Sequence, residues 1–375
     1  MPGGPRGAAD LARGQGAPRG RRLVAAAGRR RPARDPAPAA RQRLRCPARA
    51  RGAAHRPRRR RAGPGTVTSD LTCGIDIGGT KIAGAVVDAD GTVVAEGRVE
   101  SPAADAGAIA TTVAELVSDL AAGHPVRAVG VGAAGYVAAD RSTVLFAPNI
   151  AWRNEPLGAD LARRTGLPVV VENDANAAAW GEFRHGAGRD AEHQLMVTVG
   201  TGVGGGVVTG GLLLRGAYGV AAEIGHLCVV PDGLPCGCGN RGCLESYASG
   251  SALVRAAQAA PSPAVLAAAG GDPARITGPM VTAAAVAGDA GAAGLLAELG
   301  GWLGHGIASL VAVLDPEVVV VGGGVAAAGD LLLAPVREAF DRELTGRGFR
   351  PRAAIVPAVL GNRAGMIGAA DLARG

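Results

Sequence analysis

The sequence Asp76-Ile77-Gly78-Gly79-Thr80-Lys81 lies between two apolar runs and is the most informative stretch for the fold. The run before it, 73–77, predicts a strand, and the run after it, 82–87, predicts a strand that returns antiparallel. The two glycines let backbone N–H groups approach a phosphate closely, and a carboxylate ends the first strand. The stretch therefore predicts a phosphate-binding hairpin. A tight turn with a solvated Asp76 is the alternative.

The sequence Gly200-Thr201-Gly202-Val203-Gly204-Gly205-Gly206 is a second glycine-rich turn of the same kind. It follows a predicted strand at 195–199, and the β-branched run 206–214 predicts a returning strand. Its match to G-x-G-x-x-G is weak evidence for dinucleotide binding, because that motif must open a helix. We therefore predict a second phosphate-binding hairpin, with a purely structural turn as the alternative. The first turn is not a P-loop, since Thr80 precedes Lys81 and a strand follows.

The segments around the two turns alternate between strand and helix patterns, which predicts an α/β fold. Asp90-Gly91 joins two alternating runs and is a strong hairpin signal. The first unit adds strands at 92–99, 126–132 and 168–171 and helices at 108–120 and 175–183. The second adds an Ala-rich helical stretch at 252–297, interrupted near Pro273 and Pro279, helices at 301–314 and from near Asp330, strands at 318–321 and 354–360, and a closing helix at 362–372. Each unit opens with a glycine hairpin, so the sequence indicates a coarse internal duplication.

A third glycine cluster, Gly322-Gly323-Gly324, lies between the strand at 318–321 and the next helix. Such backbone suits a nucleobase or a ribose. The cluster fits the looser Rossmann fingerprint, but no acid ends the strand at 354–360 to hold a ribose hydroxyl. We therefore expect nucleotide rather than dinucleotide binding here. Helix–strand packing without a ligand is the alternative.

Four of the six cysteines lie between residues 228 and 243. His226, Cys236, Cys238 and Cys243 form a closed tetrahedral zinc set that leaves no coordination position for substrate, so the predicted zinc is structural. Cys236 and Cys238 are too near in sequence to form an easy disulfide. A reduced, buried cluster without metal is the alternative. The other cysteines are interpreted as core residues (Cys73, Cys228) or as part of the N-terminal segment (Cys46).

Glu172-Asn173-Asp174 lies where the apolar strand 168–171 meets a helix, a position at which parallel sheets bind ligands. We expect the helix N-terminus to keep Asp174 ionised near neutral pH. Such a carboxylate can accept a hydroxyl proton as a phosphoryl group transfers. Asp174 is therefore the candidate catalytic base. Plain helix capping by Asn173 or Asp174 is the alternative.

Glu223, His226 and Glu245 bracket the cysteine cluster. A loop stiffened by metal would fix two carboxylates and one imidazole in one place, which suits the hydroxyls of a sugar. Surface carboxylates without a ligand are the alternative.

Residues 1–66 differ from the rest of the chain. They hold nineteen arginines and two acids and carry +17, whereas residues 67–375 carry −10, giving the net charge of +7. An acidic body argues against nucleic-acid binding, and the composition of 1–66 predicts disorder. The apolar run after Arg21-Arg22 is too short for a twin-arginine signal, and no later stretch has membrane character. We therefore expect a cytoplasmic protein with no membrane partner.

The abrupt change at Val67 also bears on where the native protein begins. Many bacterial start codons read as valine when they are internal to a longer frame, and no methionine lies between Met1 and Met196. We therefore expect residues 1–66 to be translated upstream sequence. The alternative is a real basic tail that binds nucleic acid or an anionic surface.

Together these motifs resemble the ROK family, whose sugar kinases share the actin-like ATPase (ribonuclease H-like) fold and whose other members are sugar-responsive repressors. The resemblance runs from about Val67 to the C-terminus, and the order of motifs is most similar to that of actinobacterial ATP-dependent glucokinases. It rests on Asp76–Lys81, Pro148-Asn149-Ile150-Ala151-Trp152, Glu172–Asp174, Gly200–Gly205, Glu223–His226 and Cys236–Glu245.

The resemblance implies transfer of the ATP γ-phosphoryl group to the 6-hydroxyl of glucose, with Asp174 as base and magnesium near Asp76. The sugar would be held by Asn149, Asn173, Asp174, Glu223, His226 and Glu245. The nucleotide would be held by Asp76, Gly78, Gly79, Thr80, Lys81, Gly200, Thr201, Gly202, Gly204, Gly322, Gly323 and Gly324. One departure is Gly132-Ala133-Ala134-Gly135, where the family shows Gly-x-Pro-Gly. Loss of that proline frees a backbone angle beside the sugar.

We expect two α/β domains that flank a nucleotide and sugar cleft. The predicted segments are a disordered extension (1–66), an N-terminal sugar kinase domain (67–185), a larger domain with the zinc knuckle (186–361) and a closing helix that packs back on the first domain (362–375). The resemblance also implies a role in glycolysis and a homodimer or homotetramer without a specific nucleic-acid partner.

Two alternatives remain. The first is a ROK kinase for another hexose, namely N-acetylmannosamine, N-acetylglucosamine, mannose or fructose, with polyphosphate as a less favoured donor than ATP. The second is a sugar-responsive repressor. Such proteins carry an N-terminal helix-turn-helix module, and residues 1–66 have no periodic apolar pattern to build one.

Overall fold

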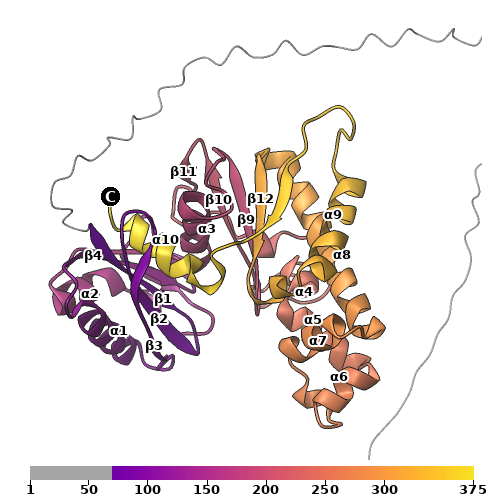
Figure 1. Ribbon diagram of the computed structural model, residues 1–375, viewed down its shortest axis with the longest axis horizontal. Helices are drawn as coiled ribbons and strands as arrows, with labels where there is room; N and C mark the ends of the chain where they lie inside the picture. Colours follow the sequence, from indigo (N-terminus) through magenta and orange to yellow (C-terminus); the bar gives the residue numbers. More distant parts are fainter. Residues whose placement is uncertain (1–69) are drawn as a thin grey trace, which may run out of the picture. The chain divides into compact units, whose positions relative to one another are not determined.

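The computed structural model describes residues 70–375, and the predictions for residues 1–66 and for a start at Val67 lie outside the described residues. Two five-stranded sheets with their helices make up most of the described part (Figure 1). The first sheet has the order β3-β2-β1-β4-β8, and the second has the order β11-β10-β9-β12-β13. Each sheet therefore joins an antiparallel hairpin to parallel strands.

The first sheet begins with the hairpin around Gly78 and Gly79. Its strands are β1 (Leu71–Ile77), β2 (Lys81–Val87), β3 (Val93–Glu100), β4 (Val126–Ala133) and β8 (Val169–Asn173). β1 and β4 are buried almost throughout and lack alternation, as expected for strands covered on both faces. The register pairs Asp76 with Gly132 and Gly132 with Glu172. The end of β1 and the turn before Asp174 therefore lie at the same edge of the sheet.

The second sheet repeats this arrangement. Its strands are β9 (Gln194–Val199), β10 (Val203–Thr209), β11 (Leu212–Leu213), β12 (Val318–Gly322) and β13 (Ala354–Pro357). β10 pairs antiparallel with β9, and β12 runs parallel to both β9 and β13. The predicted strand at 206–214 begins earlier and is interrupted, because Gly210 and Gly211 have positive φ angles of 57° and 78°. A turn therefore separates β10 from β11.

Helices cover the sheets on both faces. Those beside the first sheet are α1 (Ala106–Ala121), α2 (Leu157–Thr165) and α10 (Ala364–Leu372). α3 (Asp174–His185) packs on α10, β9 and β10. The others are α4 (Glu245–Ala248), α5 (Gly250–Ala259), α6 (Pro263–Ala268), α7 (Gly278–Val286), α8 (Ala290–Leu314) and α9 (Asp330–Glu343). Short 3-10 helices are η1 (Ile224–His226), η2 (Pro273–Arg275), η3 (Gly324–Ala328) and η4 (Gly361–Arg363).

The longest helix, α8, is continuous from Ala290 to Leu314, whereas the sequence predicted one helical stretch that ends at 297 and a new helix from 301. Asp289 caps it, because the Oδ1 atom accepts a hydrogen bond of 2.7 Å from the backbone N–H of Ala292. Among residues 70–375 it is the one helix whose length and mean hydropathy of 1.3 would allow it to cross a membrane. Leu296, Leu303 and Ile307 are buried in the core of the second half, however, which is the reason for its apolar composition.

The closing helix α10 lies across the first sheet, where Figure 1 shows it in yellow beside β1 and β2. Its backbone approaches so closely that a Cβ at Gly74 would lie 1.9 Å from the carbonyl oxygen of Met366. A Cβ at Gly130 would lie 1.8 Å from the carbonyl oxygen of Ala369. These two glycines in β1 and β4 therefore permit the contact.

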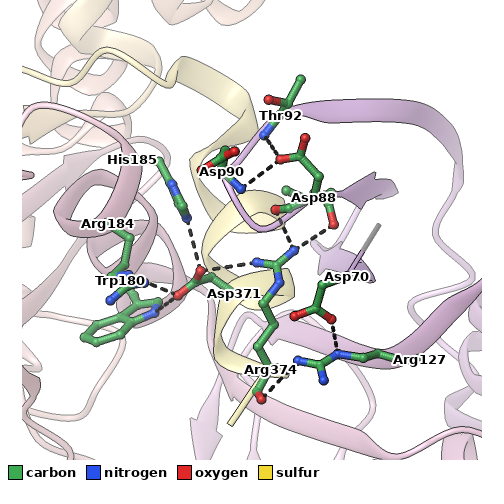
Figure 2. A network of polar contacts seen from close by, with 11 residues as sticks. Asp70, Asp88, Asp90, Thr92, Arg127, Trp180, Arg184, His185, Asp371 and Arg374 are labelled. Carbon is green, nitrogen blue, oxygen red and sulfur yellow. Dashed lines mark hydrogen bonds and ion pairs between the residues drawn. The ribbon is translucent and has the colours of Figure 1, made fainter. Parts of the chain in front are cut away.

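Polar contacts around Asp371 fix the end of α10 (Figure 2). This carboxylate accepts hydrogen bonds from Trp180 Nε1 (2.8 Å) and Arg374 Nη1 (3.2 Å) and contacts His185 Nε2 at 3.1 Å. Burial opposes its ionisation, but His185, Arg184 and Trp180 outweigh burial and lower the pKa of Asp371. The network therefore ties α10 to α3.

One buried carboxylate, Glu182 in α3, holds both segments by which the chain passes between the two sheets. Oε2 accepts a hydrogen bond of 2.8 Å from the backbone N–H of Ala187, in the segment that leads to β9. Oε1 accepts hydrogen bonds from the N–H groups of Val359 (3.0 Å) and Leu360 (2.7 Å), in the segment that leads from β13 to α10. Glu182 therefore joins the two crossovers.

Candidate active site

Two neighbouring cavities share the glycine turn between β9 and β10. The polar cavity has a volume of about 710 Å³ and includes Asn173, Asp174, Glu223, His226 and Glu245 in its lining. The apolar cavity has a volume of about 920 Å³ and is lined largely by α5, α7 and η3. The residues common to both linings are Gly200, Thr201, Ser251 and Arg255.

Asp174 is the first residue of α3 and lies at the end of β8. Asn173 caps the helix, because its Oδ1 accepts a hydrogen bond of 3.0 Å from the N–H of Asn176. Asp174 Oδ1 accepts hydrogen bonds from the N–H of Ala175 (2.9 Å) and from Asn173 Nδ2 (3.1 Å). Within residues 70–375, Asp174 Oδ2 has no hydrogen-bond partner. Asn173 therefore serves as the cap, and one oxygen of Asp174 is free to accept a proton.

Burial raises the pKa of Asp174 to about 7, with the nearby charges of Asp76 and Glu223 adding to the shift. The hydrogen bond from Ala175 opposes the rise. The expectation that the helix N-terminus keeps Asp174 fully ionised near neutral pH is therefore wrong, because desolvation and two like charges outweigh the helix dipole. A carboxyl group with this pKa is suited to general acid–base chemistry at neutral pH.

Glu223, His226 and Glu245 converge on the polar cavity together with Asn149. Glu245 Oε2 accepts a hydrogen bond of 3.1 Å from the N–H of Val203, so this carboxylate is fixed against the second glycine turn. A Cβ at Gly202 would lie 2.1 Å from the same oxygen, so a larger residue there would displace the Glu245 carboxylate. Desolvation raises the pKa of Glu223, with His226 opposing the shift and Glu245 adding to it.

The predicted metal ligands come together. The ligand atoms of His226, Cys236, Cys238 and Cys243 all lie within 4.8 Å of one another. Cys238 Sγ is 3.7 Å from Cys243 Sγ, and Cys236 Sγ is 3.6 Å from His226 Nδ1. Tetrahedral zinc with Zn–S bonds of about 2.3 Å separates its sulfur ligands by about 3.8 Å. The donor set therefore fits zinc, with His226 Nδ1 facing the cluster.

Cys228 is exposed, so its interpretation as a core residue is wrong. It pairs with Cys243 through an isolated antiparallel bridge at the edge of the cluster, which leaves its side chain outward. Cys73, by contrast, is fully buried in β1, as expected. Cys46 lies outside the described residues.

The first glycine hairpin lies beside the polar cavity and not on its lining. Gly79 packs against Asn149, because a Cβ at Gly79 would lie 3.4 Å from the Asn149 side chain. Asn149 itself lines the cavity. Asp76 is close enough to influence Asp174, and burial raises the pKa of Asp76 against the effect of Lys81. The predicted nucleotide contacts that line neither of the two cavities are Asp76, Gly78, Gly79, Thr80, Lys81 and Gly322.

The remaining predicted nucleotide contacts do line the cavities: Gly200, Thr201, Gly202, Gly204, Gly323 and Gly324. The second glycine turn also supports α5, because Gly250 N–H donates to Gly200 O (2.8 Å) and Ser251 Oγ donates to Thr201 O (2.8 Å). The start of this helix and the turn therefore form one wall of the apolar cavity.

Sequence reasoning missed Arg255, which lies one turn after Ser251 in α5. It is the one Arg or Lys of residues 70–375 on the lining of either cavity. Arg255 Nη2 donates a hydrogen bond of 2.5 Å to Ser246 O, directly after Glu245. No local sequence pattern identifies it, because its place on the lining depends on where α5 meets the second glycine turn.

Sequence reasoning also missed an aromatic wall of the polar cavity. Tyr136 and Phe146 line it with ring centroids 6.1 Å apart, and the Arg153 guanidinium lies 4.3 Å from the Phe146 centroid. They belong to a small sheet of β5 (Tyr136–Val137), β6 (Val144–Phe146) and β7 (Arg153–Glu155). Strands of two or three residues show no detectable alternation, so no sequence signal was available.

Several known proteins are similar to this chain. The model of the ROK family matches residues 72–375. The glucokinase of Streptomyces coelicolor is 50% identical over 310 residues, which are 81% of this chain and 98% of that protein. A crystal structure of a ROK family glucokinase from Streptomyces griseus in complex with glucose and AMPPNP has a TM-score of 0.76 and 51% identity, over 81% of this chain and 99% of that one. A ROK hexokinase from Thermus thermophilus has a TM-score of 0.69 and 38% identity, over 81% and 98%.

Proposed function

The chain belongs to the ROK family, and from this premise we propose that it is a glucokinase, which transfers the γ-phosphoryl group of ATP to the 6-hydroxyl of glucose. The actin-like sugar kinase fold predicted from the sequence is confirmed. The observation that carries the proposal is the polar cavity, whose lining places Asp174, with its raised pKa, together with Glu223, Glu245 and the glycine turn. The structures similar to this chain include a ROK family glucokinase in complex with glucose and AMPPNP.

Asp174 is the proposed catalytic base. Its Oδ2 atom accepts the proton of the sugar 6-hydroxyl as that oxygen attacks the γ-phosphorus and the bond to the ADP oxygen breaks. Asn173 supports this role, because its amide holds Asp174 Oδ1 and leaves Oδ2 for the substrate. Desolvation keeps the pKa of Asp174 near 7, where the carboxylate is basic enough to accept a proton and is still substantially ionised.

The sugar is proposed to bind among Asn149, Asn173, Glu223, His226 and Glu245. Carboxylate oxygens accept hydrogen bonds from hydroxyls, and the imidazole Nε2 remains for the sugar when Nδ1 faces the metal ligands. Zinc would be held by His226, Cys236, Cys238 and Cys243 in a closed site. Its contribution is to fix this loop and not to bind substrate.

ATP is proposed to lie across both cavities, with its base and ribose in the apolar one. The backbone of Gly323 and Gly324 and the walls of α5 and α7 suit a flat, uncharged group. Backbone N–H groups of the second glycine turn, together with the Arg255 guanidinium, suit the phosphates. Magnesium would neutralise the phosphate charge, with Asp76 as its proposed protein ligand.

A sugar panel tests the proposal. Purified protein with ATP, magnesium and a coupled assay for ADP is expected to give its highest kcat/KM with glucose. Mannose, fructose, N-acetylmannosamine and N-acetylglucosamine are the competitors, and polyphosphate replaces ATP in a parallel series. A higher kcat/KM with another hexose would assign the enzyme to that sugar, and absence of turnover with all of them would contradict the kinase function.

We also propose that the protein is cytoplasmic and forms a homodimer or a homotetramer.

A further inference from the structure

Glu172 stands directly before Asn173 and Asp174, yet its side chain does not line the polar cavity. It is only 2% exposed. Oε1 accepts hydrogen bonds from the backbone N–H of Asn173 (3.1 Å) and from Asn176 Nδ2 (3.1 Å). One oxygen of this buried carboxylate therefore holds the first turn of α3, the turn that carries the proposed base.

The other oxygen of Glu172 binds a guanidinium from a distant part of the chain. Arg215 Nε lies 2.5 Å from Oε2, and Arg141 Nε lies 4.0 Å from the same atom. Arg215 follows β11 and begins the loop that leads to Glu223 and His226. Its carbonyl oxygen accepts a hydrogen bond of 3.1 Å from the N–H of Ala221, which closes that loop on itself.

The loop from Arg215 to Glu223 is docked against the small sheet on the other side. Gly219 has a φ of 90°, and a Cβ there would lie 2.4 Å from the carbonyl oxygen of Val137. The Arg215 side chain and the Gly219 backbone are thus two attachment points of one loop. Both lie before the residues that are proposed to bind the sugar.

The contribution of this Glu172–Arg215–Arg141 cluster to folding stability does not explain its presence. Two guanidinium groups approach one buried carboxylate, and within residues 70–375 Arg141 Nε and Nη2 are buried without a hydrogen-bond partner. Burial and the charge of Arg215 lower the pKa of Arg141, with Glu172 opposing them. Arg141 also has a positive φ of 56°, which is strained for a residue with a side chain. The Glu172 carboxylate is buried, whereas the side chains of Arg215 and Arg141 are 27% and 30% exposed. An ion pair that buries one of its charges adds little net stability over an apolar replacement, so a positional role is the better explanation.

We propose that the Glu172–Arg215 ion pair is a positioning device, which sets the sugar-binding loop at Glu223 and His226 relative to the catalytic turn at Asp174. Arg141 is its second guanidinium. Neither Glu172 nor Arg215 touches the substrates; each acts through the segment it holds. The inference rests on the proposed function, because it assigns the two segments to sugar binding and to proton transfer.

The test compares Arg215→Met, Arg215→Lys, Glu172→Gln and the double variant Glu172→Gln/Arg215→Met in steady-state kinetics with glucose and ATP. For Arg215→Met we expect KM for glucose to rise and kcat to fall, each about tenfold, with KM for ATP unchanged, since small misplacements of reacting groups cost up to about a hundredfold. Arg215→Lys, which retains the charge, should recover part of the loss. The double variant should have the same KM for glucose and the same kcat as Arg215→Met, because the two residues act as one unit.

The matched control is Arg163→Met, which removes an exposed ion pair with Asp160 on α2 and should leave all kinetic constants unchanged. Melting temperature and zinc content of each variant are measured alongside. Normal glucose constants in a folded Arg215→Met protein would overturn the inference, as would equal losses with both substrates. Failure of the proposed function looks different, since the parent protein would then not phosphorylate glucose at all.

Discussion

The polar and the apolar cavity share one glycine turn but differ in the chemistry of their other walls. The polar cavity presents side chains that carry or accept protons, and these are held by the metal-ligand set and by the first turn of α3. The apolar cavity presents helix faces such as Val254, Pro279 and Val286 and the backbone of Gly324. The difference indicates that ligand binding in the polar cavity depends on fixed charges, whereas ligand binding in the apolar cavity depends on shape. Substitutions should therefore affect turnover and glucose binding on one side and nucleotide binding on the other.

The largest effect is expected at the proposed base. Asp174→Asn keeps the volume and the hydrogen bond to Ala175 but cannot accept the hydroxyl proton, so kcat should fall by roughly two to four orders of magnitude. Folding, zinc content and glucose affinity should stay close to those of the parent, as measured by melting temperature, metal analysis and calorimetry. Near-normal turnover in this variant would remove Asp174 from the mechanism.

The metal-ligand set should matter for the polar cavity alone. Cys238→Ser is expected to lose zinc and to lower kcat/KM for glucose by about tenfold to a hundredfold, because Glu223, His226 and Glu245 lose their support. Metal analysis of the parent should find about one zinc per chain.

Cys228→Ser is the control for this experiment, since Cys228 is exposed and outside the ligand set. It should retain both zinc and activity. A parent enzyme that is fully active without zinc would show that the cluster has another role.

The pH dependence reports on the same cavity. Since the pKa of Asp174 is about 7, kcat/KM for glucose should fall about tenfold per pH unit below that value and level off above it. Burial sets most of this midpoint, and the charges of Asp76 and Glu223 raise it further. A midpoint near the ordinary aspartate pKa of 3.8 would contradict the burial described for this site.

Stability should show the opposite trend with pH. The folded state holds the Asp174 proton up to about pH 7, whereas the unfolded state releases it near 3.8. The folded protein therefore binds more protons between these values, so this group's contribution to the free energy of unfolding decreases as pH rises through that window. Thermal melts of the parent and of Asp174→Asn between pH 5 and 7 measure the contribution as a difference.

The smallest effect is expected on the nucleotide side. Arg255→Gln should raise KM for ATP about tenfold, the size of one charge-assisted hydrogen bond, and leave KM for glucose unchanged. Arg255→Lys should restore part of the affinity. Arg275→Gln, an exposed arginine of η2, is the matched control. A change in KM for glucose alone would place Arg255 on the sugar side.

Much of this arrangement could be predicted from the sequence, because it depends on local patterns. The two glycine hairpins, their β-branched flanks and the His–Cys spacing each specify their own geometry, and the metal ligands meet as expected. The predicted break between residues 297 and 301 was wrong, because Gly300 and Gly301 interrupt the sequence pattern but not the helix that Asp289 caps.

Contacts between distant segments could not be predicted in this way. The pKa of Asp174 depends on Asp76 and Glu223, which lie far from it in sequence. The position of Arg255 depends on where α5 meets the glycine turn. The same holds for the pairing of Glu172 with Arg215, since no local pattern relates a strand end to a loop.

The carboxylate of Glu182 has a consequence for hydrogen exchange. The amide protons of Ala187, Val359 and Leu360 come from two segments far apart in sequence, but they share this single acceptor. Any motion that withdraws the carboxylate exposes all three to solvent at once. Their exchange rates should therefore be correlated, and they mark the two crossovers as one cooperative unit rather than as two independent linkers.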